Sequence, residues 1–272
     1  ALALLCWVTG RKAASGLLIG IICLIKPHYG LFLVWAGLRR EWRFVAACAA
    51  AIGAGIAASV AVFGWANHID YLRVLSFLSE RGESYYPNQS VNGLLNRLMS
   101  IVEPNLYNNV VWREGHFPPF TPWIYVGTMA SSLLILFAAL ARRLRENDPG
   151  RVLDFCTMIV SLTIASPIAW EHHYGVLLPV YALLFVASWP DARRLAWLAA
   201  SYVLVANFVP AANLLALGVF NVAQSHLLAG ALVLLALLHG RPATAVAGAR
   251  LAGMAKAPVF ADSPAAQAPP PA

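Results

Sequence analysis

Charged residues are scarce in this 272-residue sequence. Only 11% of its residues are Asp, Glu, Lys or Arg, whereas soluble domains contain about 25%. Hydrophobic residues make up 60%, and the mean hydropathy is +0.67. These values exclude a soluble domain, a disordered chain and a nucleic-acid-binding protein, despite a net charge of +7. The composition predicts an all-α polytopic membrane protein whose basic residues mark cytoplasmic loops.

Metal-binding and disulfide patterns are also missing. The four cysteines, Cys6, Cys23, Cys48 and Cys156, lie in or beside apolar runs without C-x-x-C spacing. We interpret them as reduced core residues. The nucleotide-phosphate pattern G-x-x-x-x-G-K-[ST] does not occur. We therefore expect no metal and no cofactor.

The sequence has no initiator Met and no signal-peptide features before its first apolar run. Nine residues precede Gly10, whereas a spanning helix needs about 20. We interpret residues 1–8 as the end of a helix that begins upstream, so that the domain at 1–240 lacks its N-terminal part. The alternative is an ordinary short terminal segment. Residues 241–272, rich in Ala and Pro, are expected to form a disordered cytoplasmic tail.

The loops between the apolar runs are of two kinds. The short basic loops belong in the cytoplasm by the positive-inside rule. Residues 66–118 and the turns near 166–174 and 218–225 then lie outside. The basic loops carry Arg39, Arg40 and Arg43, then Arg142, Arg143, Arg145 and Arg151, then Arg193 and Arg194. The apolar runs are 13–38, 44–65, 119–141, 152–165, 175–189, 195–217 and 226–239.

Two of the apolar segments are interrupted. A single helix over 13–38 would bury Lys26 at the bilayer centre, which is costly. We favour two short helices, 13–25 and 28–38, that turn at Lys26-Pro27, with Gly16 and Gly20 indicating close packing of this hairpin. Residues 152–189 have the same form, with a polar turn at 166–174. Short, Pro-interrupted segments point to a binding site.

The longest hydrophilic stretch, 66–118, contains two expected helices. The first begins at the N-cap Asn67 and ends at Gly82, and its apolar face predicts a position along the membrane surface. The second covers about 90–101 and places Arg97 on its polar face. Between them, residues 85–90 combine tyrosines with Asn88 and Gln89, a composition that can hold a sugar. The alternative is a loop of interface aromatics.

The interrupted segments bring several polar residues to one side of the membrane. This set holds cations and neutral imidazoles but few carboxylates, which favours an anionic group such as phosphate over a metal. Because no nucleotide loop is present, the natural ligand is a lipid phosphate. The residues concerned are Lys26, His28, Glu171, His172 and His173.

Three motifs in order resemble the polytopic C-type glycosyltransferases, and glycosyltransferase family 87 most closely. That family includes the mycobacterial polyprenyl-phosphate-mannose-dependent alpha-mannosyltransferases. The resemblance covers about residues 13–240. The motifs are Lys26-Pro27 followed by Leu38-Arg39-Arg40-Glu41-Trp42-Arg43, then Asn88-Gln89-Ser90-Val91-Asn92-Gly93 with Arg97, then Ser166-Pro167-Ile168-Ala169-Trp170-Glu171-His172-His173.

The resemblance implies transfer of a hexose from polyprenyl phosphate to a lipid or glycan acceptor, and mannose is the hexose that we expect. It places the enzyme in the bacterial inner membrane with its site facing the periplasm or exterior. The implied general base is an Asp upstream of residue 1, so this chain alone is expected to be inactive. By matching motif, Lys26, Arg97, His172 and His173 become candidates for the phosphate or sugar, and Asn88 and Gln89 for sugar hydroxyls. Glu171 departs from the family pattern.

Two other functions fit the same residues. Broken helices and intramembrane charges also occur in transporters and lipid flippases, whose substrate site would lie at 26–28 and 166–174. Such a protein needs a path open to both sides, whereas these polar turns converge on one side. A structural subunit is the third possibility, with the histidines buried and hydrogen-bonded only.

Overall fold

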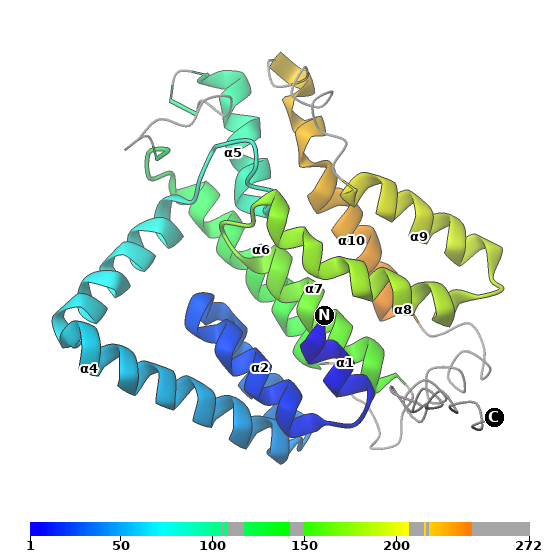
Figure 1. Ribbon diagram of the computed structural model, residues 1–272. Coiled ribbons are helices and arrows are strands. Elements are labelled where there is room, and N and C mark those ends of the chain that lie inside the picture. The colour runs from blue at the N-terminus through cyan, green and yellow to red at the C-terminus, as the bar shows by residue number, and fades with distance from the viewer. Residues whose placement is uncertain (105, 108–116, 142–149, 207–214, 216–217, 241–272) are drawn as a thin grey trace, which may run out of the picture.

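The computed structural model describes residues 1–104, 106–107, 117–141, 150–206, 215 and 218–240. Over these residues the chain is helical and has no strand, which confirms the all-α prediction (Figure 1). The expected tail at 241–272 lies outside them. The α-helices are α1 (Leu2–Val8), α2 (Lys12–Ile25), α3 (Leu31–Leu38), α4 (Trp42–Arg81), α5 (Val91–Val102), α6 (Pro122–Ala141), α7 (Arg151–Ala165), α8 (Leu178–Ser188), α9 (Ala192–Val205) and α10 (His226–His239), and short 3-10 helices are η1 (Pro27–Gly30), η2 (Glu171–Leu177) and η4 (Gly218–Ser225).

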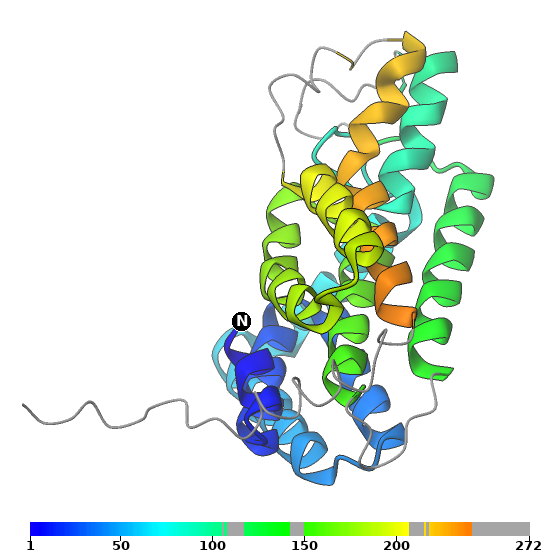
Figure 2. The ribbon, with the colours of Figure 1, turned by 90° about the vertical axis from the view of Figure 1, so that its right-hand side faces the viewer.

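Three of the described helices are long and apolar enough to cross a bilayer. They are Trp42–Arg81, Pro122–Ala141 and the continuous stretch Val219–His239. The shorter helices pack among them: α2 lies against α4, α7 against α6 and α10, α9 against α10, and α8 against α9 (Figures 1 and 2). The chain is thus a polytopic membrane protein that combines full-length with interrupted helices.

The segment 13–38 is a hairpin, as the sequence predicts. Helix α2 ends where the Lys26 amide bonds to the Ile22 carbonyl, and Pro27 opens the 3-10 turn η1 because it has no amide hydrogen to continue an α-helix. The chain then returns through α3, so that Lys12 Nζ lies 4.0 Å from Glu41 Oε1. Both ends of the hairpin therefore lie at the same end of the molecule, and Lys26 lies at its turn.

The small-residue face of α2 has a different partner from the one expected. Gly16 and Gly20 pack against α4, and not against the returning arm of the hairpin. A Cβ atom on Gly16 would lie 2.3 Å from the Phe44 carbonyl oxygen, and one on Gly20 would lie 2.7 Å from the Cys48 carbonyl oxygen. Absence of a side chain lets the two backbones approach closely, which fixes the position of α2 and of Lys26 beyond its end.

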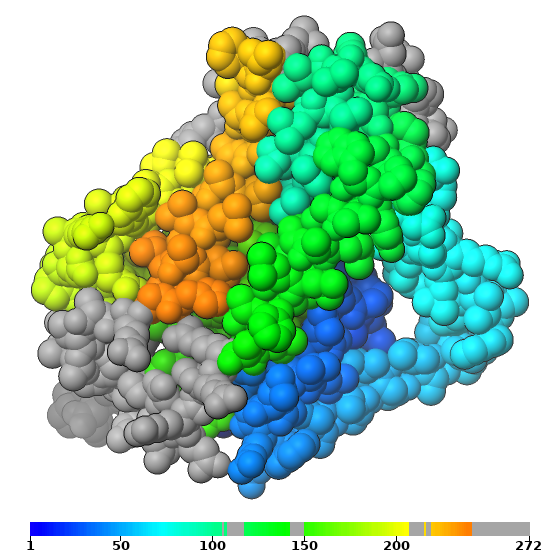
Figure 3. Space-filling view, turned by 180° about the vertical axis from the view of Figure 1, so that it is seen from behind, coloured from blue at the N-terminus to red at the C-terminus, as the bar shows by residue number. Residues whose placement is uncertain are grey.

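Helix α4 is sharply bent at Gly64, three residues before the helix start that the sequence predicts at Asn67. Gly64 has φ +76° and ψ 160°, a conformation that other residues rarely adopt, and it joins two helical limbs. The expected start at Asn67 is wrong, because the second limb begins directly after Gly64 and the Asn67 side-chain amide bonds back to the Phe63 carbonyl. The end at Gly82 is confirmed. Figures 1 and 3 show the bend projecting from the rest of the molecule.

An aromatic cluster holds the open end of the first hairpin, opposite its turn, to α7. The rings of Trp7 and Phe155 stack with centroids 4.9 Å apart, and Trp35 lies 5.1 Å from Trp7. Beside them Asp154 accepts bonds from Arg39 Nε at 2.6 Å and from the Trp35 indole at 3.0 Å. Arg39 also donates to carbonyls at the end of α6, where helix carbonyls lack partners. This packing fixes α3 relative to α6 and α7.

Candidate functional site

The two interrupted segments meet around one cavity. Lys26 and Tyr29 from the first turn face His172 and His173 from the second across a space of about 300 Å³. The remaining lining is apolar and comes from α1, α2, α7 and the start of α8. Segments far apart in the sequence thus place an ammonium group and two imidazoles in one small, largely apolar space, which suits an anionic group.

One hydrogen bond defines the chemistry of His173. Its Nδ1 accepts from the Trp170 backbone amide at 3.0 Å. A neutral imidazole that accepts at one nitrogen carries its proton on the other, so Nε2 of His173 is a hydrogen-bond donor. The His172 ring lies 4.3 Å from His173 at an interplanar angle of 74°. The pair therefore offers a donor to the cavity without needing a net charge.

The loop 82–90 is hydrogen-bonded to the second turn, and we call this contact the outer clasp. Main-chain bonds join the Gln89 amide to the Ala169 carbonyl at 2.7 Å and the Glu171 amide to the Pro87 carbonyl at 3.1 Å. Ser90 Oγ caps α5 and also donates to the Pro167 carbonyl at 2.8 Å. Two of the three motifs seen in the sequence, 88–93 and 166–173, are therefore direct neighbours.

Asn88 and Gln89 are buried within the outer clasp. The Asn88 amide donates to the carbonyls of Glu83 and Pro167, and its Oδ1 accepts from the Ala169 amide at 3.0 Å. Gln89 Nε2 donates to the Gln224 carbonyl at 2.8 Å. Both side chains are at most 1% exposed. In this structure they bond to protein, and neither lines the cavity; a sugar-binding role for them stays a prediction.

Arg97 is fully buried between the outer clasp and η4. It donates to Ser225 Oγ at 3.1 Å and to the Tyr86 carbonyl, while its Nε has no partner among the described residues. Burial lowers the pKa of Arg97 to about 10, against the opposing charges of Tyr174 and Glu171. The expected polar face of α5 points inward, towards η4, and Asn92 and Asn96 on it are buried too. Arg97 does not line the cavity.

Two further candidates lie beside the cavity. The half-buried His28 ring is 5.0 Å from the ring of Tyr29, which lines the cavity. Glu171 follows Trp170 in the turn, and its charge acts on Arg97. The structure therefore brings Lys26, His172 and His173 together and leaves His28 and Glu171 at the edge.

Sequence reasoning missed Glu83, the first residue after the glycine that ends α4. It is only 3% exposed, and its carboxylate accepts the Trp170 indole hydrogen at 2.5 Å. Burial raises the pKa of Glu83, and the bond from Trp170 opposes that rise. No sequence pattern marked it, because a Glu after a helix end usually faces solvent.

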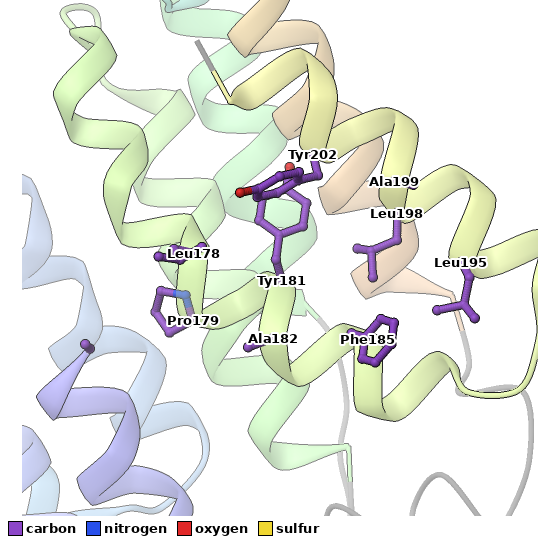
Figure 4. A pocket seen from close by; sticks show the side chains of 10 residues that line it. Leu178, Pro179, Tyr181, Ala182, Phe185, Leu195, Leu198, Ala199 and Tyr202 are labelled. Atoms are coloured by element: carbon purple, nitrogen blue, oxygen red, sulfur yellow. The ribbon is translucent and has the colours of Figure 1, made fainter. Parts of the chain in front are cut away.

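An apolar groove adjoins the cavity. It has a volume of about 690 Å³ and lies between α8 and α9, as Figure 4 shows. Its lining is apolar apart from the hydroxyl groups of Tyr181 and Tyr202. Ala1 and Pro179 line both the groove and the cavity. A cationic space and an apolar one are thus neighbours, an arrangement that suits a ligand with an anionic head and a hydrocarbon chain.

Comparison with known proteins gives a consistent result. The family model described as Glycosyltransferase family 87 matches residues 1–167. A polyprenol-phosphate-mannose-dependent alpha-(1-2)-phosphatidylinositol pentamannoside mannosyltransferase of Mycolicibacterium smegmatis is 31% identical over 72% of this chain and 45% of its own length. Polyprenol-phosphate-mannose-dependent alpha-(1-2)-phosphatidylinositol mannoside mannosyltransferases of M. smegmatis and Mycobacterium tuberculosis are each 26% identical, over 68% and 72% of this chain and 39% and 42% of theirs. The chain thus spans less than half the length of these relatives. No solved structure matches it significantly.

Proposed function

Because this chain belongs to glycosyltransferase family 87, we propose that the protein transfers a mannosyl group from a polyprenyl-phosphate donor to a lipid or glycan acceptor. The reaction takes place at the outer face of the bacterial inner membrane. The names of the relatives, which are polyprenol-phosphate-mannose-dependent and act on phosphatidylinositol mannosides, support this donor and a lipid acceptor.

The observation that carries the proposal is the position of the apolar groove beside the cationic cavity. The donor phosphate lies against Lys26, His172 and His173, and its isoprenoid chain lies in the groove between α8 and α9. Because an isoprenoid chain moves there from lipid, which is equally apolar, the groove contributes through packing and shape and not through a hydrophobic driving force. Recognition of head and chain together distinguishes a lipid-linked sugar from a free sugar phosphate.

The reaction needs charge stabilisation at the phosphate. An acceptor hydroxyl attacks the anomeric carbon, the bond from that carbon to the phosphate oxygen breaks, and its electron pair leaves with the polyprenyl phosphate. The hydroxyl proton passes to a general base, which the family resemblance assigns to an Asp outside these 272 residues. The phosphate gains one negative charge in this step. Lys26 and the Nε2–H of His173 stabilise that charge where it develops.

The test is sugar transfer in membranes that contain the complete gene product. Labelled polyprenyl-phosphate-mannose is supplied, and wild type is compared with Lys26→Met and His173→Ala. Removal of a donor to developing charge costs about 10²–10³-fold in rate. His239→Ala is the matched control, since His239 bonds to a carbonyl within its own helix α10 and should retain full activity.

The outcomes separate the candidate functions. Transfer lost in both cavity variants and kept in the control supports the proposal. No transfer by the wild type with several lipid-linked sugars refutes it and favours a transporter or flippase, which a lipid or solute flux assay would then test.

A further inference from the structure

Glu83 is a buried carboxylate without a cationic partner. Of the described residues, no Lys, Arg or His nitrogen lies within 4.0 Å of its oxygens. Burial of an unpaired carboxylate is costly. Its side chain bonds instead to the Trp170 indole, whose residue lies directly before the turn that bears the histidines. A costly group beside a reactive pair suggests a purpose beyond folding.

The outer clasp does not need the Glu83 side chain to stay closed. Main-chain bonds from Gln89 and Glu171 and the Asn88 amide already join the two loops. Even the bond between Glu83 and Asn88 uses the Glu83 main-chain carbonyl. The carboxylate therefore adds one thing to this contact: it fixes the rotation of the Trp170 ring.

Trp170 contacts both histidines. Its ring lies 5.7 Å from the His172 ring in an edge-on arrangement, and its backbone amide donates to His173 Nδ1. Trp170 is 36% exposed, so its ring would have room to reorient if the indole bond were lost. A change in the ring would therefore reach His172 directly, whereas the backbone bond to His173 would stay in place.

We propose that Glu83 is a positioning residue, which holds the Trp170 indole and thereby keeps the His172 ring in its orientation at the cavity. This inference rests on the proposed function, because it assigns a use to that orientation. Glu83 does not line the cavity.

The kinetic test uses the complete gene product and four variants. Glu83→Leu keeps the side-chain size and removes the acceptor, whereas Glu83→Gln keeps one acceptor oxygen. Trp170→Phe removes the indole donor. The double variant Glu83→Leu/Trp170→Phe combines both losses. Misplacement of a catalytic group by 1 Å can cost about 10²-fold in rate. We expect kcat to fall about tenfold or more in Glu83→Leu and Trp170→Phe, with donor KM unchanged and with most activity kept in Glu83→Gln. The double variant should be no worse than either single one.

The chain offers a matched control. Asp154 also accepts an indole hydrogen, from Trp35, at the opposite end of α7. Trp35→Phe removes a bond of the same kind away from the cavity. It should lower the amount of folded protein and leave kcat per folded molecule unchanged.

A second readout needs no activity. In ¹⁵N spectra of histidine-labelled protein, the His172 signal is the one missing from His172→Gln. Wild type and Glu83→Gln should show the same His172 chemical shift, and Glu83→Leu a shifted or broadened His172 signal. If the complete protein transfers no sugar, the proposed function fails while this spectrum still tests the positioning. An unchanged His172 signal in Glu83→Leu, or additive rate losses in the double variant, would overturn the inference.

Discussion

The contact between α2 and α4 allows a quantitative prediction at Gly16. An Ala side chain there would place its Cβ 2.3 Å from the Phe44 carbonyl oxygen and 2.9 Å from the Phe44 Cα. Ordinary contact begins at 3.4 Å, so the helices must separate by about 1 Å. Both clashing groups are backbone, and no side-chain rotation can relieve them.

Two effects oppose each other in Gly16→Ala. Replacement of Gly by Ala within a helix is favourable by about 1 kcal/mol, whereas overpacking costs about 1–3 kcal/mol. Because the clash is with backbone, we expect an overpacking cost in the upper part of that range. The free energy of unfolding should then fall by roughly 1–2 kcal/mol. Gly53→Ala is the control. Gly53 lies on α4, and a Cβ atom added there would meet nothing within 4 Å, so only the favourable effect applies.

The assay is the half-life of the folded protein at a fixed elevated temperature in one detergent, since unfolding of such proteins is often irreversible. Gly16→Ala should shorten the half-life and Gly53→Ala should lengthen it. Since Lys26 follows α2 directly, a shift of α2 should also reduce transfer per folded molecule in Gly16→Ala. A Gly16→Ala protein as long-lived as Gly53→Ala would refute the close packing of α2 and α4.

Three further predictions concern the core and the clasp. Trp7→Ala should lower the free energy of unfolding by about 3–5 kcal/mol, because Trp7 is 2% exposed in the aromatic cluster, and should shorten the thermal half-life. Trp42 is 64% exposed, so Trp42→Ala should change the half-life little. Asp154→Ala removes the carboxylate that pairs with the buried Arg39. The free energy of unfolding should fall by about 3–5 kcal/mol, which should appear as a sharp fall in folded yield. The double variant Asp154→Ala/Arg39→Met should recover part of that yield. Burial raises the pKa of Glu83 above 4.5, so the folded state keeps that proton to higher pH and stability falls as pH rises through this window. Glu83→Gln should therefore gain half-life relative to wild type as the pH rises from 4.5, and a pH-independent difference would contradict the shift.

The sequence alone determined most of the helices and their interruptions. Apolar runs produce helices because each backbone group must find a partner within the bilayer. Pro27 interrupts the first hairpin and Gly82 ends α4 for local reasons, a missing amide hydrogen and a positive φ of 66°. The free cysteines also follow from composition and spacing.

Only the tertiary structure decided which faces turn inward. The periodicity of residues 90–101 shows two faces of α5. It cannot tell that the polar face is buried, with Asn92 bonded to Thr128 of α6 and Arg97 to Ser225 of η4, while Leu98 is 41% exposed. In a membrane protein apolar faces can meet lipid, so polarity loses its usual meaning as a guide to burial. The bend at Gly64 depended in the same way on packing, because a glycine permits a positive φ without requiring it.

The candidate site shows the same division. Local sequence marked Lys26, His172 and His173, because polar residues at Pro-interrupted turns in apolar segments stand out. Their meeting around one cavity, and the burial of Glu83 against Trp170, depend on contacts between segments far apart in the chain. Such contacts arise from the sum of packing over the whole bundle, which no short stretch of sequence encodes.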